Sequence, residues 1–296
     1  MTILDSIKCK SSKDVRLYDY CNGKFKQLPS RKSLKKAIDQ ELVLVNGIAQ
    51  KTGFWLRGGE QITLITNENK PPKPYKLDLE ILFEDDYLIM VNKPAGLRVS
   101  GNQFKTLSNV LAYNFTKSQA EDALGWPLPV HRLDQPTSGI VISAKSKRAR
   151  IRMGKLFEEQ KIEKYYHAIV IGEPENLFES FDKIDEKEAE SHFEKLRTVN
   201  SLRSGKLSLV KINPKTGRKH QIRKHLSSLG FPILGDQIYS ASELKLKHKG
   251  MFLCATEVKF SHPITNRLIH IELDLPKKYE KRLESENKRW QNTMQA

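Results

Sequence analysis

The sequence has no long hydrophobic segment and few cysteines. No apolar run in its 296 residues approaches the roughly 20 residues that a membrane-spanning helix needs, so we expect no association with a membrane. The opening segment Met1–Lys8 lacks the apolar block of a secretory signal, which predicts a cytoplasmic location. The cysteines Cys9, Cys21 and Cys254 form no Cys-x-x-Cys pair, which argues against a disulfide framework and a structural zinc site.

Acidic residues are also scarce relative to basic ones. The chain has 51 Lys and Arg against 35 Asp and Glu, a formal net charge of +16. Such an excess favours a polyanionic partner. With a membrane disfavoured, nucleic acid is the expected partner. The spacing of His220 and His225, five residues rather than four, does not place two ligands on one helical face, so no metal site is expected.

The length of the chain and its proline distribution predict two folded units. The chain exceeds the usual length of one domain. Three prolines between residues 67 and 76 interrupt the apolar periodicity and indicate a linker. We therefore expect a flexible lead-in at 1–15, a small module at 16–66, the linker at 67–76, a main domain at 77–283 and a polar tail at 284–296.

The small module combines a basic helix with a tight hairpin. Ser30 is a plausible N-cap for a helix that has Leu34, Ala37 and Ile38 on one face and basic residues on the other. A hairpin turns at Asn46-Gly47, and a third strand follows at 61–65. This combination resembles the small RNA-binding module of a ribosomal small-subunit protein and of several RNA-modifying enzymes. The resemblance implies RNA contacts from six residues, Ser30, Arg31, Lys32, Lys35, Lys36 and Asn46; the alternative is a small α/β cap that only packs on the main domain.

The main domain is expected to contain more strands than helices. Helices are predicted to start near Thr106, Ser146 and Arg218. The expected strands are 81–83, 87–91, 139–145, 163–171, 206–212, 253–260 and 268–273. Hairpin-like connections predominate, so the predicted fold class is α+β, with a largely antiparallel mixed sheet flanked by helices.

Polar groups concentrate in residues 131–139, immediately before an apolar strand. The segment reads His131-Arg-Leu-Asp134-x-x-Thr137-Ser138-Gly139. It resembles, at each defined position, the signature of the RluA-type family of pseudouridine synthases. Three further segments resemble the same family in the expected order, so that the resemblance spans about residues 77–275: Glu84–Gly96, Lys164–Ala168 and Thr216–Tyr239.

The resemblance implies the pseudouridine synthase fold and the isomerisation of uridine to pseudouridine in structured RNA. That reaction needs no cofactor and no metal, but it needs a positioned carboxylate. Asp134 is expected to be the catalytic nucleophile, by attack on the sugar or base or by removal of a ribose proton. Burial disfavours an ionised carboxylate, so a permanent cation is expected beside it, and Arg223 matches the family's arginine. Tyr166 is expected to stack on an extruded uracil.

Five further residues are assigned to substrate binding. The guanidinium of Arg132 is expected to fill the space that a flipped base leaves in its helix. His131 either assists the reaction or only hydrogen-bonds its loop. Thr137 and Ser138 are expected to shape that loop, with Gly139 allowing another backbone to pass close by. Ile222 lies on the apolar face of the helix that carries the expected arginine.

Structural roles compete with each functional assignment. Asp134 could cap its own turn, Arg223 could be a surface cation and Tyr166 a core tyrosine. At the level of the whole protein, the alternative is a non-catalytic RNA-binding or ribosome assembly factor with a synthase-like fold. A metal-dependent nuclease would need clustered acidic or histidine ligands, which the sequence lacks. Ribosomal RNA is favoured over transfer RNA, and we expect a monomer.

Overall fold

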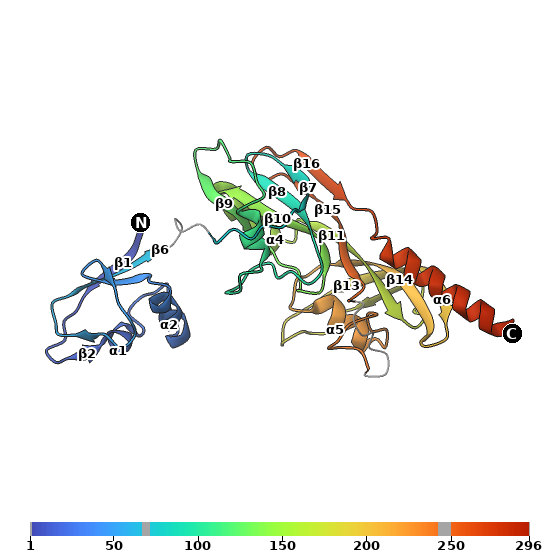
Figure 1. The fold of residues 1–296 in the computed structure, drawn as a ribbon, viewed down its shortest axis with the longest axis horizontal. Helices are drawn as coiled ribbons and strands as arrows, with labels where there is room; N and C mark the ends of the chain where they lie inside the picture. Colours follow the sequence, from blue (N-terminus) through green and yellow to red (C-terminus); the bar gives the residue numbers. More distant parts are fainter. Residues whose placement is uncertain (1, 67–71, 242–249, 296) are drawn as a thin grey trace. The chain divides into compact units, whose positions relative to one another are not determined.

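The computed structural model describes residues 2–66, 72–241 and 250–295, and it divides into two units, Met1–Pro71 and Pro72–Ala296 (Figure 1). The expected linker, 67–76, lies partly outside the described residues. Each unit has its own hydrophobic core. Among the described residues, no helix is long and apolar enough to cross a membrane.

The small unit is built around the predicted helix and hairpin. Helix α2 (Arg31–Asp39) begins as predicted at Ser30, whose hydroxyl accepts a hydrogen bond from the backbone N–H of Ser33 at 3.1 Å. Leu34, Ala37 and Ile38 are buried. The hairpin β3 (Val43–Val45) and β4 (Ile48–Ala49) and the strand β6 (Gln61–Thr66) are also confirmed.

The prediction of a flexible lead-in at 1–15 was wrong. Strand β1 (Thr2–Lys8) pairs antiparallel with β6, and the four-stranded sheet has the order β1-β6-β3-β4. The lead-in lacks an apolar periodicity because β1 lies at the edge of the sheet, where Ile3 and Leu4 stay exposed. Further short elements that the sequence did not predict are β2 (Val15–Arg16), α1 (Leu17–Cys21) and β5 (Trp55–Leu56).

The large unit contains a ten-stranded mixed sheet, as the predicted α+β class requires. Its main path is β12-β13-β14-β11-β15-β10-β8-β7, with β16 added to β15 and β9 to β10. Among its described pairings, only that between β10 and β15 is parallel. The strands are β7 (Glu80–Glu84), β8 (Leu88–Lys93), β9 (Ala123–Pro129), β10 (Ser138–Ser146), β11 (Glu163–Ile171), β12 (Leu177–Ser180), β13 (Ser191–Ser201), β14 (Gly205–Pro214), β15 (Leu253–Ser261) and β16 (Leu268–Glu272).

Helices pack on both faces of this sheet, because side chains alternate along each strand. On β11, Ala168 and Val170 pack with α5 (Gln221–Ser228), whereas Ile169 and Ile171 pack with α6 (Lys278–Met294). Helix α4 (Lys147–Glu158) and helix α3 (Leu107–Leu111) similarly belong to different core clusters. Helix α5 therefore lies on the opposite face from α6, and Figure 1 shows α6 running along the β13–β14 side of the sheet.

The expected polar tail, 284–296, is mostly helical. Residues 284–294 continue α6, and the nearby Tyr279 and Leu283 are fully buried against the sheet. The carboxylate of Glu286 accepts a hydrogen bond from Ser201 at 2.5 Å. The sequence did not predict that α6 packs on the sheet, because only one narrow stripe of this helix is apolar. Strands β9, β12 and β13 were not predicted either; in β13 the buried Phe193 and Val199 are separated by five residues, three of which are charged.

Candidate active site

The Asp134 loop connects β9 to β10 and is tied down through its backbone. The Thr137 N–H donates to the carbonyl of Asp134 at 3.1 Å, and the Gly96 N–H donates to the carbonyl of Gln135 at 2.8 Å. Thus the carbonyl of Asp134, not its carboxylate, closes the turn. A Cβ at Gly139 would lie 2.1 Å from the Ala255 carbonyl oxygen, so only glycine fits where β10 meets β15.

A buried lysine also holds the Asp134 loop in place. Lys93, at the end of β8, is fully buried, and its ammonium donates to the carbonyls of Pro94 at 2.9 Å, Leu97 at 2.8 Å and Gln135 at 3.4 Å. Burial lowers the pKa of Lys93 to about 8, although the charge of Asp134 acts in the opposite direction. The sequence showed only that a strand ends at Lys93-Pro94, with no indication that the ammonium is internal.

Arg223 joins two carboxylates from separate segments. Its Nη1 donates to Oδ2 of Asp134 at 3.1 Å, while Nε and Nη2 form a bidentate pair with Asp236 at 2.7 and 2.9 Å. The guanidinium is 3% exposed, so it is not a surface cation. Burial raises the pKa of Asp236, but hydrogen bonds from Arg223 and from the backbone of Ile238 and Tyr239 outweigh burial and lower it. The bidentate pair thus orients the one remaining guanidinium nitrogen toward Asp134.

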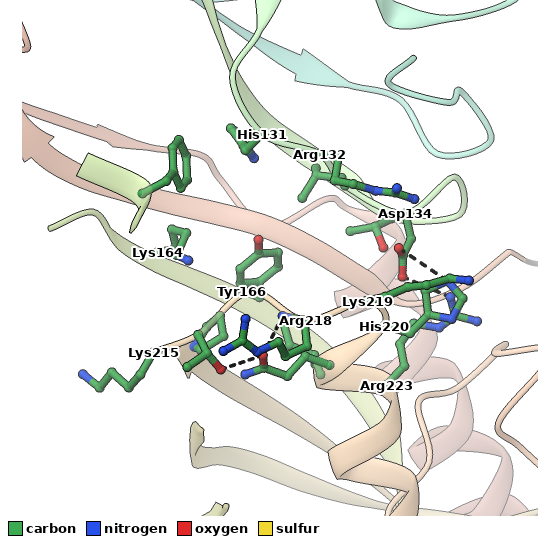
Figure 2. Close-up of a pocket in the computed structure, with 18 of the residues that line it drawn as sticks. His131, Arg132, Asp134, Lys164, Tyr166, Lys215, Arg218, Lys219, His220 and Arg223 are labelled. Carbon is green, nitrogen blue, oxygen red and sulfur yellow. Dashed lines mark hydrogen bonds and ion pairs between the residues drawn. The ribbon is translucent and has the colours of Figure 1, made fainter. Parts of the chain in front are cut away.

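Asp134 opens onto a cavity of about 670 Å³. Figure 2 shows Asp134 facing the start of α5, where His220 and Arg223 lie, with the ring of Tyr166 beside them. Burial raises the pKa of Tyr166, and the negative charge of Asp134 acts in the same direction, so its phenol stays neutral. The cavity is lined in part by apolar and aromatic groups and in part by basic residues, the latter being Arg132, Lys164, Lys215, Arg218 and Lys219.

His131 is a structural anchor of the loop. Its Nε2 accepts a hydrogen bond from the backbone N–H of Ile142 at 2.9 Å, and its ring packs on Phe157 with the centroids 5.1 Å apart. Burial lowers the pKa of His131 to about 3, and the nearby charge of Lys164 contributes. A neutral ring whose nitrogen is engaged by the backbone is suited to hold the loop, which is one of the two roles expected for His131.

His220 and Tyr239 also lie close to Asp134, although the sequence predicted no catalytic or binding role for either residue. His220 Nε2 lies 3.6 Å from Oδ1 of Asp134, and His220 Nδ1 lies 2.9 Å from the hydroxyl oxygen of Tyr239. Both residues, like Asp236, fall within the segment Thr216–Tyr239 that resembles the family. The resemblance of that segment to the family therefore indicated that it forms part of the site. The sequence did not show which of its polar side chains would converge on Asp134.

The structure brings together most of the predicted site residues of the large unit. Asp134, Tyr166, Arg223, Arg132, His131, Thr137 and Ile222 all line the cavity. Ser138 is not among these lining residues: it begins β10 opposite Cys254, and its side chain interacts with that thiol. The described residues contain no group of three or more His, Cys, Asp or Glu side chains able to hold a metal ion.

In the small unit, the predicted RNA contacts fall into two kinds. Arg31, Lys32, Lys35 and Lys36 are exposed along α2. The hydroxyl of Ser30 caps the helix, and the side-chain oxygen of Asn46 accepts a hydrogen bond from the Gln61 N–H at 2.9 Å. Ser30 and Asn46 therefore each use a side-chain oxygen to hold the fold of the unit, and both residues are exposed.

Comparison with known proteins agrees with this geometry. The fold matches a human protein described as RNA pseudouridylate synthase domain containing 1, with a TM-score of 0.56 and 24% identity over 67% of this chain and 83% of that one. This is the pseudouridine synthase fold. Residues 87–228 match the family described as RNA pseudouridylate synthase.

Two relatives have closely similar sequences. The chain is 37% identical over 216 residues to the dual-specificity RNA pseudouridine synthase RluA of Haemophilus influenzae, covering 67% of this chain and 92% of that protein. It is 31% identical over 275 residues to the ribosomal large subunit pseudouridine synthase C of Rickettsia felis, covering 82% and 88%. The chain belongs to the RluA-type family of RNA pseudouridine synthases, isomerases that convert uridine in RNA to pseudouridine.

Proposed function

We propose that this enzyme modifies uridines in ribosomal RNA, and that Asp134 is the catalytic nucleophile acting on a nucleotide flipped into the cavity. One observation carries the proposal. The carboxylate of Asp134 lines an open cavity beside Tyr166 and is paired with the buried guanidinium of Arg223 at 3.1 Å. A carboxylate paired with a permanent cation stays ionised even where water is scarce.

The chemistry requires an ionised carboxylate but no change of oxidation state. The bond from ribose C1′ to uracil N1 breaks, the base turns, and C1′ joins C5; the proton lost from C5 is balanced by one gained at N1. Attack on the nucleotide and removal of a ribose proton both begin at a carboxylate oxygen, so both routes use Asp134 in the same charge state. Arg223 donates to Oδ2, so Oδ1 is the carboxylate oxygen that receives no hydrogen bond from Arg223.

The cavity suits a single extruded nucleotide. Its volume of about 670 Å³ falls in the range typical of small-ligand sites. The ring of Tyr166 offers a stacking surface, and stacking on an aromatic ring is worth about 1–3 kcal/mol per base. Lys215, Arg218 and Lys219 supply positive charge at the same cavity, where the flanking phosphates of the RNA would enter. Arg132, which also lines the cavity, would occupy the space vacated by the base.

Two observations support ribosomal RNA as the substrate and the small unit as an RNA-binding module. Helix α2 presents Arg31, Lys32, Lys35 and Lys36 to solvent, where phosphates can reach them. The similarity to the ribosomal large-subunit enzyme covers 82% of this chain, which exceeds the share of the chain in Pro72–Ala296 and so extends into the small unit. The similarity to RluA covers only 67%. We expect a monomer, acting in the cytoplasm on RNA of the ribosome.

The test is Asp134→Asn, which keeps the shape of the side chain and removes its charge. Pseudouridine formation on ribosomal RNA should fall at least about a thousandfold, as for loss of a nucleophile, while RNA binding and the melting temperature stay near wild type. Asp185→Asn is the matched control, because the Asp185 carboxylate is 68% exposed and pairs with Lys224 outside the cavity. Normal turnover by Asp134→Asn would end the proposal. A wild-type protein that binds ribosomal RNA tightly but forms no pseudouridine would favour the non-catalytic assembly factor.

A further inference from the structure

His220 closes a ring of contacts around the Asp134 carboxylate. Arg223 binds Oδ2 of Asp134 and both oxygens of Asp236. Oδ1 of Asp236 also accepts a hydrogen bond from the Tyr239 N–H at 3.2 Å, and the Tyr239 hydroxyl lies 2.9 Å from His220 Nδ1. His220 Nε2 then faces Oδ1 of Asp134 at 3.6 Å. Each oxygen of Asp134 is therefore approached by a different arm of one network, and both arms start from Asp236.

The backbone of His220 adopts a conformation that is uncommon for a residue with a Cβ. His220 has φ +57° and ψ +24°, in the left-handed region, and it stands at the N-cap of α5. Residues with a Cβ seldom adopt this region, and such strain persists where the surrounding structure fixes the side chain for a purpose. Asparagine and glycine are the residues that this region accommodates best. The strained conformation aims the imidazole at Asp134.

The surroundings of His220 favour a neutral ring. Burial lowers the pKa of His220, Asp134 raises it, and the charges of Arg223 and Lys219 lower it further. Asp236 also acts on the ring and raises the pKa slightly. A neutral imidazole carries one proton. If the Tyr239 hydroxyl donates to Nδ1, that proton stays on Nε2, the nitrogen that faces Oδ1 of Asp134.

We propose that His220, held by Tyr239, is a positioning residue that fixes the Asp134 carboxylate for attack. The inference rests on the proposed function, since it assigns a partner to the proposed nucleophile. Arg223 holds Oδ2, and the Nε2–H of His220 limits the rotation of the carboxylate by facing Oδ1. The separation of 3.6 Å is longer than a hydrogen bond. Contacts of this kind in unliganded enzymes commonly shorten when substrate binds.

The orientation of the Asp134 carboxylate needs a second contact because its side chain is less tightly enclosed than those of its partners. The Asp134 side chain is 15% exposed, whereas Arg223 is 3% and Asp236 0% exposed. Asp134 and His220 also line a second cavity next to the first, so the carboxylate has open space on more than one side. One hydrogen bond from Arg223 leaves rotation about that bond unopposed. A neutral N–H at Oδ1 restricts the rotation without adding a positive charge that would lower the reactivity of the carboxylate.

The test uses His220→Asn and Tyr239→Phe, with Glu186→Asn as the matched control. Asparagine tolerates the left-handed backbone, so His220→Asn removes the imidazole without adding strain. Glu186 is exposed, has φ +59°, and lies outside both cavities, so its replacement by asparagine relieves similar strain elsewhere. Tyr239→Phe keeps the ring under the Arg223 guanidinium, whose centre lies 5.0 Å from the ring centroid, and removes only the hydroxyl.

We expect kcat for pseudouridine formation to fall about tenfold to a hundredfold in His220→Asn, the cost of a misplaced reacting group. KM should stay within about twofold of wild type, and the melting temperature should be equal or higher, since strain is relieved. Tyr239→Phe should lower kcat by a smaller factor, and the double variant should be no slower than His220→Asn, because both changes act through one contact. Glu186→Asn should keep wild-type kcat.

The outcomes separate this inference from the proposed function. If the wild type is active and Asp134→Asn is inactive, but His220→Asn retains wild-type kcat, the positioning role is wrong and the nucleophile stands. A loss of kcat accompanied by a lower melting temperature would show a structural role and would also overturn the inference. If His220→Asn does not fold, Tyr239→Phe decides: unchanged kcat there rejects the proposal. Inactive wild type contradicts the proposed function itself.

Discussion

The two units of the molecule differ most in what they bury. Among the described residues, the small unit buries only hydrophobic side chains, such as Leu17, Phe25 and Leu34. The large unit also buries charged groups, including Lys93 and Arg223. Burying an ion costs free energy unless it is paired and hydrogen-bonded. The large unit therefore surrounds its buried charges with hydrogen-bond partners that hold them in fixed positions, whereas the small unit keeps its charges in water.

The same residue type consequently serves two different purposes. Arg31 on α2 is exposed and free to move with an RNA backbone, whereas Arg223 is fixed by three hydrogen bonds to two carboxylates. An exposed cation contributes to affinity mainly by releasing counterions from nucleic acid. A buried cation instead orients its partner. Binding and catalysis should therefore respond to different substitutions, and four experiments, ordered by expected effect, test that separation.

The largest effect is expected for Arg223→Lys. An ammonium cannot hold Asp236 in a bidentate pair and reach Asp134 at the same time, so kcat should fall by more than about a hundredfold. Breaking a buried pair typically costs about 3–5 kcal/mol of unfolding free energy, and chemical denaturation should show a loss of that order. Arg31→Lys is the control and should change neither quantity. If the Arg223→Lys enzyme were stable and active, the buried arginine of the large unit would not differ in its effect from the exposed Arg31 of the small unit.

The second-largest effect is expected on the affinity for RNA, after substitutions in the small unit. Replacing Lys32, Lys35 and Lys36 together by Gln should weaken binding to ribosomal RNA and reduce the slope of log affinity against log salt by up to about three. At saturating RNA, kcat should stay at the wild-type value. The matched control replaces three exposed lysines, the N-cap Lys277 of α6 and Lys281 and Lys288 within α6, which changes the net charge equally. Equal losses in both triple variants would mean that only total charge matters.

The third effect is a pH dependence of stability caused by His131. Its pKa is about 3 in the folded protein against an ordinary value of 6.5, so between these values the unfolded state binds the proton and the folded state does not. The free energy of unfolding should therefore fall as the pH drops from 6.5 toward 3, by up to about 1.4 kcal/mol per pH unit. His131→Gln retains an acceptor for the Ile142 N–H and should show a shallower slope between pH 7 and 5.

The control for this slope is His192→Gln. The side chain of His192 is 42% exposed and contacts Glu190 at 2.7 Å, so it is a histidine outside the Asp134 loop. Its replacement should leave the slope close to that of wild type. An unchanged slope in His131→Gln would contradict the neutral, loop-holding role of His131.

The smallest effect is expected for Ser30→Ala in the small unit. Loss of an N-cap hydroxyl typically costs about 1 kcal/mol. The free energy of unfolding should fall by about that amount, while kcat on ribosomal RNA stays unchanged. Ser30→Asp, which restores a capping group, should recover the stability. If Ser30→Ala instead lowered RNA affinity at unchanged stability, the hydroxyl would be an RNA contact rather than a cap.

Much of the fold was predictable because the elements carry local signals. The capping serine at Ser30 and the turn at Asn46-Gly47 determine short-range structure, and both were found where expected. The apolar strand after Gly139 and the strand Glu163–Ile171 were equally clear. Elements at sheet edges, such as β1 and β12, lack this signal because one or both of their faces meet water. The presence of β1 also depends on β6, a partner strand far away in the chain.

The sequence by itself determined the charge of the protein, the order of its motifs and the candidate residues Asp134, Tyr166 and Arg223, because composition and spacing are local properties. Only the tertiary structure decided that Arg223 also binds Asp236 and that His220 faces Asp134. Arg223 and Asp134 are 89 positions apart, and no periodicity relates them. Contacts of this kind arise from how β10, β11 and α5 pack, and that packing depends on the whole core rather than on any one segment.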